Sequence, residues 1–160
     1  MTVNAFPVDR VHAPAAVVWG VPDAPSGYGG FWEMTVERVE PAGPAAVGQR
    51  FFAWTLCRRL RADVEILEVD AVQHAIRFHT TLPFGLVGAN RILCSPIDAD
   101  NCTLRYGCDF SFPPGWRRRL LNRFGGRVHA SVADSLPHLK RAAELRARQA
   151  ETGDANDGRA

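Results

Sequence analysis

The feature that most constrains the fold is an apolar stripe near the end of the chain. Apolar residues recur there in steps of three or four, at Leu120, Phe124, Val128, Val132, Leu136, Leu139 and Ala143. This spacing is typical of one face of an α-helix, and we predict a helix over about Gly115 to Gln149. Gly125 and Gly126 weaken its start, and Pro137 predicts a bend without a break. A helix of this length cannot bury its stripe alone, so it needs a broad apolar partner.

The segments before this helix have the period-two alternation of β-strands. We predict strands at 6–12, 35–40, 49–58, 60–71, 75–82, 89–95 and 102–112, with two short helical turns after the first, one of them over 15–21. The alternation slips near Leu67, which predicts a β-bulge. The prediction is an α+β fold in which an antiparallel sheet of about seven strands curves around the long C-terminal helix.

One hairpin tests the predicted faces of the sheet. Centring it on Ala99 pairs Cys94 with Leu104 and Ile92 with Tyr106, so both apolar sets lie on the same face. Charged residues of the two strands then share the opposite face. The sequence therefore predicts one apolar face toward the helix and one polar face toward water.

Composition limits the classes of function. The 160 residues suit a single domain over 1–150, and we expect the polar segment 151–160 to be a disordered tail. A net charge of +2 gives no indication of nucleic-acid binding. No apolar run approaches the ~20 residues of a membrane span, and the N-terminus lacks a signal-peptide pattern, so we expect a cytoplasmic protein. The cysteines have no zinc-site spacing, and we expect no metal and no cofactor. A Cys94–Cys102 bridge is a minor alternative to free thiols.

Four segments resemble a known superfamily. They are Val11–Trp19, Tyr28–Trp32, Val47–Gln49 and Leu136–Glu144. Together they are similar to the START-like (Bet v 1-like, SRPBCC) helix-grip proteins, and within these to the polyketide cyclase/dehydratase and lipid-transport group. The resemblance implies a helix-grip fold with a hydrophobic cavity. It leaves the activity open, because members cyclise polyketides, bind or sequester hydrophobic metabolites, or assist other enzymes.

The predicted inward faces give a candidate cavity wall. It comprises Phe52, Trp54, Val64, Ile66, Phe78, Thr80, Asn90, Ile92, Cys94, Tyr106, Cys108 and Phe110 on the sheet, with Leu120, Phe124 and Val128 on the helix. We expect Tyr28 and Trp32 to close one mouth of the cavity. Such a wall suits a bulky apolar ligand oriented by few hydrogen bonds. It carries no carboxylate pair, which argues against glycosidase chemistry.

Tyr106 and Asn90 are the candidate catalytic residues. The Tyr106 phenol could donate to a ligand carbonyl or act as a weak acid, and Asn90 needs partners for its amide. The alternative is that both are satisfied inside an ordinary core. Cys108 lacks a basic neighbour and is a poor nucleophile. His12 and Arg10 face either the cavity or the solvent.

Two functions fit these residues. The first is a cyclase or aromatase of secondary metabolism that folds a polyketide-type intermediate for ring closure. The second is a carrier or self-resistance protein that binds a hydrophobic metabolite without changing it. Arg117, Arg118, Arg119 and Arg123 form either a solvated face or a docking site for an acidic carrier protein. Either a monomer or a homodimer is compatible with the sequence.

Overall fold

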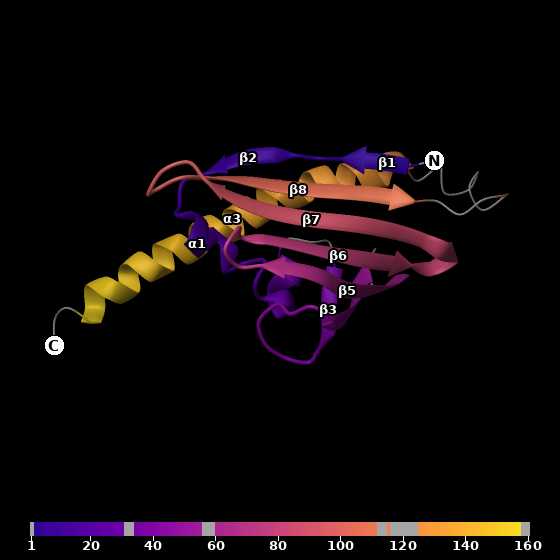
Figure 1. Ribbon diagram of the computed structural model, residues 1–160, viewed down its shortest axis with the longest axis horizontal. Helices are drawn as coiled ribbons and strands as arrows, with labels where there is room; N and C mark the ends of the chain where they lie inside the picture. The colour runs from indigo at the N-terminus through magenta and orange to yellow at the C-terminus, as the bar shows by residue number, and fades with distance from the viewer. Residues whose placement is uncertain (1, 31–33, 56–59, 112–114, 116–124, 158–160) are drawn as a thin grey trace.

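The protein consists of a curved antiparallel sheet that packs along one side of a long C-terminal helix (Figure 1). The computed structural model describes residues 2–30, 34–55, 60–111, 115 and 125–157, with only the backbone of 2–4, 55, 84, 125–129, 131–132 and 150–157. The elements are β1 (Thr2–Ala5), β2 (Val8–Val11), α1 (Ala15–Trp19), η1 (Pro25–Gly30), β3 (Met34–Glu40), β4 (Arg50–Thr55), β5 (Leu60–Asp70), β6 (Ala75–Leu82), η2 (Pro83–Gly85), β7 (Leu86–Pro96), β8 (Cys102–Ser111) and α3 (Gly125–Asp157).

The sheet has the strand order β1–β8–β7–β6–β5–β4–β3, and β2 also pairs with β8. The strand predicted over 6–12 corresponds to β2, and β1 is an additional strand; the two form one edge on either side of Phe6 and Pro7. The Tyr106 backbone N–H donates to the Pro7 carbonyl at 3.1 Å. Phe6 lies over Gly107, where an added Cβ would come within 2.8 Å of Phe6 Cδ1. The glycine at 107 leaves room for the Phe6 ring between β1 and β2.

The β7–β8 hairpin has the predicted register. Cys94 pairs with Leu104 and Ile92 pairs with Tyr106, and all four side chains are buried. The register of β5 against β6 shifts between Ile66 and Glu68, which confirms the predicted bulge near Leu67. Cys94, Cys102 and Cys108 are free thiols.

The predicted face of β4 is wrong. Phe51 and Ala53 are buried, whereas Phe52 and Trp54 lie on the outer face. The Phe52 ring packs under the guanidinium groups of Arg38 and Arg61, at 5.2 and 4.5 Å from its centroid. Trp54 Nε1 donates to Glu37 Oε2 at 3.1 Å. The alternation of aromatic residues predicts that they face inward, but two cations and a carboxylate cover them on the outer face.

The described part of the predicted stripe on α3 is buried. It comprises Leu136, Leu139 and Ala143, Ala147 extends it by one turn, and the helix runs through Pro137. Lys140 Nζ forms an ion pair with Asp9 Oδ2 at 3.0 Å, which joins α3 to β2. The helix ends at Asp157 and not near Gln149, so it includes most of the segment that we expected to be a disordered tail. No helix within the described ranges is long and apolar enough to cross a membrane.

Candidate functional site

A hydrogen-bonded network of three polar side chains lies on the inward face of the sheet. Tyr106 Oη donates to Asn90 Oδ1 at 3.1 Å, and Asn90 Nδ2 donates to Thr80 Oγ1 at 3.0 Å. The residues come from β8, β7 and β6 and form a diagonal line across adjacent strands. Thr80, Asn90 and Tyr106 are only 3%, 5% and 4% exposed. The two candidate catalytic residues are thus in contact, with Thr80 as a third member.

Gly88 fixes the orientation of the Asn90 amide. Its carbonyl accepts a second hydrogen bond from Asn90 Nδ2 at 3.2 Å. A carbonyl cannot donate, so the amide nitrogen must face Gly88 and the amide oxygen must face Tyr106. The site also requires a glycine, because an added Cβ would lie 2.9 Å from the Phe110 ring and 3.4 Å from Asn90 Nδ2.

Apolar residues surround the network, and the nearby thiols hold their protons. Phe78 and Ile92 are fully buried, and Phe110 is half-buried. Burial raises the pKa of the Cys108 thiol to about 12, with a smaller contribution from Asp109. The same effect raises the pKa of Cys94 to about 12, with a smaller contribution from Cys102. A thiol with such a pKa is a poor nucleophile at neutral pH, as the sequence predicted for Cys108.

The end of the sheet next to η1 is filled by aromatic core. Tyr28 is fully buried, and its ring centroid lies 5.3 Å from Phe51 and 6.0 Å from Phe78. The Tyr28 hydroxyl donates to the Pro22 carbonyl at 2.6 Å. The prediction that Tyr28 closes a cavity mouth is therefore wrong, since it packs within the core.

Several predicted site residues are not tested. Trp32, Phe124, Arg117, Arg118, Arg119 and Arg123 lie outside the described residues, and the side chain of Val128 is not described. A docking site for an acidic carrier protein on these arginines stays a prediction. Trp54 belongs to the outer surface, as shown above.

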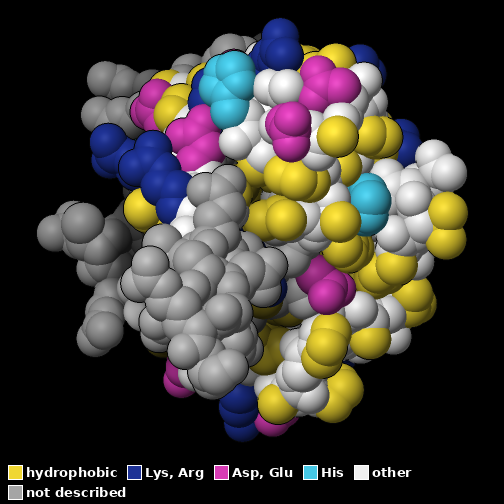
Figure 2. Space-filling model, turned by 90° about the vertical axis from the view of Figure 1, so that its left-hand side faces the viewer, with side chains coloured by type: hydrophobic (Ala, Val, Ile, Leu, Met, Phe, Trp, Pro, Cys, Tyr) yellow, Lys and Arg dark blue, Asp and Glu magenta, His cyan; other side chains and the backbone are white. Residues whose placement is uncertain are grey.

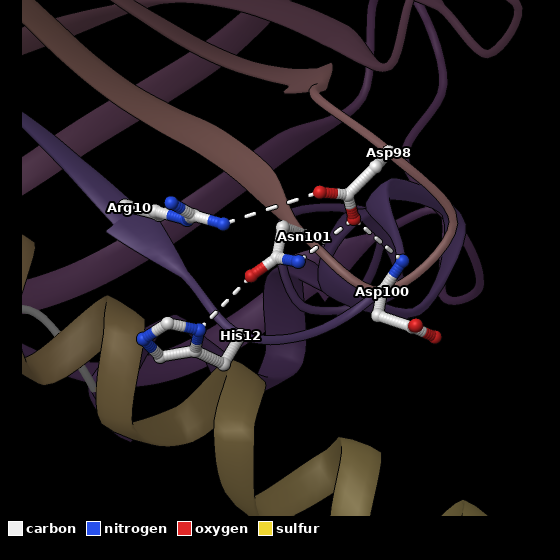
Figure 3. Close-up of polar contacts among 5 residues, drawn as sticks. All are labelled: Arg10, His12, Asp98, Asp100 and Asn101. Atoms are coloured by element: carbon white, nitrogen blue, oxygen red, sulfur yellow. Dashed lines mark hydrogen bonds and ion pairs between the residues drawn. The ribbon is translucent and has the colours of Figure 1, made fainter.

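His12 and Arg10 face outward. His12 Nδ1 and Asn101 Oδ1 are 2.9 Å apart, Asn101 Nδ2 donates to Asp98 at 2.7 Å, and Arg10 reaches the same carboxylate at 3.9 Å (Figure 3). His12 also borders a surface hollow of about 370 Å³, together with Glu144, Ala147 and Arg148 on α3. Figure 2 shows this end of the molecule, where basic, acidic, histidine and apolar side chains are mixed. Sequence reasoning missed this cluster, because the turn that carries Asp98 and Asn101 looked only polar.

Side chains that are charged at neutral pH are absent from the described part of the core. The buried polar residues there are Gln49, Thr80, Asn90 and Ser135. No group of three or more His, Cys, Asp or Glu residues in the described ranges could hold a metal ion. The inward face therefore offers neutral hydrogen-bonding groups.

Comparison with known families is decisive for the class of protein. Residues 8–144 match the family described as "Polyketide cyclase / dehydrase and lipid transport". The chain belongs to this family. The family fits the network geometry, because a mostly apolar inner wall with few polar groups suits a hydrophobic small molecule. None of the curated protein sequences is significantly similar to the chain.

Solved structures confirm the helix-grip fold. The Zhui aromatase/cyclase from Streptomyces sp. R1128 is 17% identical, with a TM-score of 0.67 over 91% of this chain and 96% of that chain. Norcoclaurine synthase from Thalictrum flavum, solved with dopamine and hydroxybenzaldehyde, is 16% identical, with a TM-score of 0.58 over 88% of each chain. DynU16, from the dynemicin biosynthetic locus, is 16% identical, with a TM-score of 0.64 over 89% of this chain. The chain spans about half of DynU16, at 47% of its length. At these identities the likeness concerns the fold.

Proposed function

We propose that the protein binds a hydrophobic, polyketide-type intermediate between the sheet and α3 and positions it for intramolecular cyclisation. The observation that carries this proposal is the buried Tyr106–Asn90–Thr80 network, which is the polar point on an otherwise apolar wall. Family membership supports the ligand class, and one relative of the same fold is an aromatase/cyclase.

The chemistry rests on positioning. When a polyketide chain closes a ring, a carbon beside one carbonyl loses a proton and bonds to the carbon of a second carbonyl. The oxygen of that second carbonyl takes up a proton, and no electrons leave the molecule. Holding the two carbons together can lower the barrier by roughly 7–11 kcal/mol at best. Hydrogen bonds from the network to the developing oxyanion would add to this effect.

The second candidate is a binding protein that sequesters or carries the same kind of molecule unchanged. Its supporting observation is the absence of carboxylates, histidines, lysines and arginines among the buried residues of the described part of the chain. A ring closure needs a proton acceptor, and the described wall supplies neutral groups only. Solvent or the ligand itself would have to accept the proton in the cyclase.

Binding and mass analysis separate the two candidates. Aromatic polyketides and their linear precursors would be screened by thermal shift. The incubated ligands would then be analysed by liquid chromatography and mass spectrometry. For a cyclase we expect stabilisation together with loss of water or a changed retention time that marks ring closure. Stabilisation with unchanged ligands indicates the binding protein. If none of these molecules stabilises the fold, both candidates are wrong.

Tyr106→Phe tests whether the network takes part. It removes the hydroxyl that holds Asn90, so we expect ring closure to slow by at least tenfold while the apolar ligand still binds. The matched control is Tyr28→Phe, the same chemical change at the other tyrosine of the chain. Tyr28 bonds to Pro22 within the core, outside the network, so its loss should lower stability and leave turnover per folded molecule unchanged.

A further inference from the structure

We infer that Thr80 is the residue of the network that donates a hydrogen bond to the ligand, and that the ligand presents a carbonyl oxygen to it. This inference rests on the proposed function, because it requires a ligand between the sheet and α3. It changes the roles expected from the sequence, where Tyr106 was the candidate donor.

The network has one possible direction. The Gly88 carbonyl fixes the Asn90 amide nitrogen, so Asn90 Oδ1 must face Tyr106 and accept its proton. The other hydrogen of the amide nitrogen points to Thr80, whose oxygen accepts it. The Tyr106 proton is therefore used inside the protein. Tyr106 becomes a positioning residue, because it acts on Asn90.

Thr80 is where the network ends. Its hydroxyl oxygen accepts from Asn90, which leaves its own proton to be donated elsewhere. Within the described part of the chain, the Thr80 hydroxyl makes no further hydrogen bond, although the residue is only 3% exposed. A buried donor without an acceptor is rare in folded proteins and calls for a partner. A ligand oxygen on the inward side of β6 would satisfy it.

The chemical class of that oxygen follows from the direction of the network. A hydroxyl proton is donated to an acceptor, and the ketone oxygens of a polyketide chain are such acceptors. The neighbouring side chains Phe78 and Ile92 are apolar and fully buried, so they offer packing without a competing hydrogen bond. A ketone should thus bind here more tightly than a hydrocarbon of the same shape.

The experiment uses two small probes on the full chain. The first is 2-acetylnaphthalene labelled with ¹³C at its carbonyl, and the second is 2-ethylnaphthalene, which has a similar shape and no oxygen. Both affinities are measured for the wild type and for Thr80→Val, Thr80→Ser and Thr81→Val. Thr81 is exposed on the outer face of the same strand, which makes it the matched control. The infrared stretch of the bound ¹³C carbonyl reports its hydrogen bond directly.

We expect Thr80→Val to lower the affinity for 2-acetylnaphthalene about tenfold, which corresponds to the loss of one net hydrogen bond. The affinity for 2-ethylnaphthalene should not change. When the probe is bound to the wild type, its carbonyl stretching frequency should be lower than that of the free probe in hexane. In Thr80→Val the frequency should rise toward the hexane value. Thr80→Ser should restore both values, and Thr81→Val should alter neither. Tyr106→Phe should broaden the stretch, because Asn90 loses its orientation.

Two outcomes separate failure of this inference from failure of the proposed function. If the wild type binds both probes but its carbonyl stretch matches that in hexane, Thr80 is not the donor while the apolar site stands. That measurement needs no variant, so it decides the matter even if Thr80→Val does not fold. If the wild type binds neither these probes nor any polyketide, the proposed function is overturned together with the inference.

Discussion

Gln49 shows how one buried side chain organises a loop. It is 1% exposed and lies directly before β4. Its Nε2 donates to the carbonyls of Pro41 and Gly43 at 2.7 and 3.4 Å, and its Oε1 accepts from the Ala46 N–H at 3.3 Å. Both ends of the amide are therefore used to close the connection between β3 and β4.

Gln49→Leu should destabilise the protein by about 1–3 kcal/mol, because it removes the three hydrogen bonds through which the buried amide holds the loop. Urea unfolding followed by circular dichroism measures this change. Gln73→Leu is the control, since Gln73 is exposed in the turn between β5 and β6. Equal unfolding midpoints for the two variants would show that the amide bonds of Gln49 contribute nothing net.

Individual residues were predictable where the strand pattern was clear. Tyr106 and Asn90 lie on inward-facing positions of β8 and β7, which a single hairpin register determines. Trp54 and Tyr28 were misplaced for a common reason, since a large aromatic side chain fits a core, an outer surface or a cavity wall. Trp54 is held outside by Glu37, and Tyr28 inside by Pro22. The alternation of residues along a strand does not indicate either of these partners, so the sequence could not predict the two contacts.

At the scale of elements, the contact between β2 and α3 contains an ion pair. The hydrogen bond from Lys140 lowers the pKa of Asp9 below 3.8, against a smaller opposing effect of burial. The folded pKa lies below the unfolded one, so the stabilisation is present above pH 3.8 and is lost as the pH falls through the folded pKa. The Asp9 side chain is 42% exposed, and solvent therefore screens the pair.

Lys140→Gln should lower the free energy of unfolding by about 0.2–1 kcal/mol near neutral pH. At a pH well below the folded pKa of Asp9, the variant and the wild type should have the same stability. Thermal unfolding at both pH values measures this difference. Arg141→Gln is the control, because Arg141 is exposed on the same helix and has no ion pair among the described residues. A deficit that persists at low pH would mean that packing of Lys140, and not its charge, joins the elements.

Sequence patterns determined some elements better than others. The β7–β8 turn is short, so its two strands have one sensible register, and the bulge in β5 shows as a slip in alternation. In β4, the pairs Phe51 with Val64 and Ala53 with Ala62 determine which side chains face the core. This could be predicted only if the register of β4 against β5 were already known. The far end of α3 has a polar composition without an apolar anchor, so helix length could not be predicted there.

The molecule as a whole should lose stability in alkali. Burial raises the pKa values of Cys94 and Cys108 from 9.0 to about 12, and it raises that of Tyr28 above its usual 10.0. Between about pH 9 and pH 12 the folded protein keeps protons that the unfolded chain has lost. The free energy of unfolding must therefore fall as the pH rises, by at most ~1.4 kcal/mol per pH unit for each group.

Urea titrations at pH 8 and at two higher values would measure this slope. The double variant Cys94→Ala, Cys108→Ala should show a shallower decline, because only Tyr28 and the rest of the chain then contribute. The loss of packing volume lowers its stability equally at every pH and does not affect the comparison. Parallel lines for the two proteins would mean that these thiols ionise without unfolding.

The edge formed by β1 and β2 has a consequence for synthesis of the chain. Its residues pair with β8, so that Thr2 lies opposite Ser111 and Val11 opposite Cys102. A ribosome makes the N-terminal segment first, yet this segment has no partner strand until β8, which begins at Cys102, has been translated. Contacts between residues so distant in sequence form slowly. Newly made chains therefore carry an unpaired N-terminal segment until β8 is made, and this is the period in which a chaperone would have most to protect.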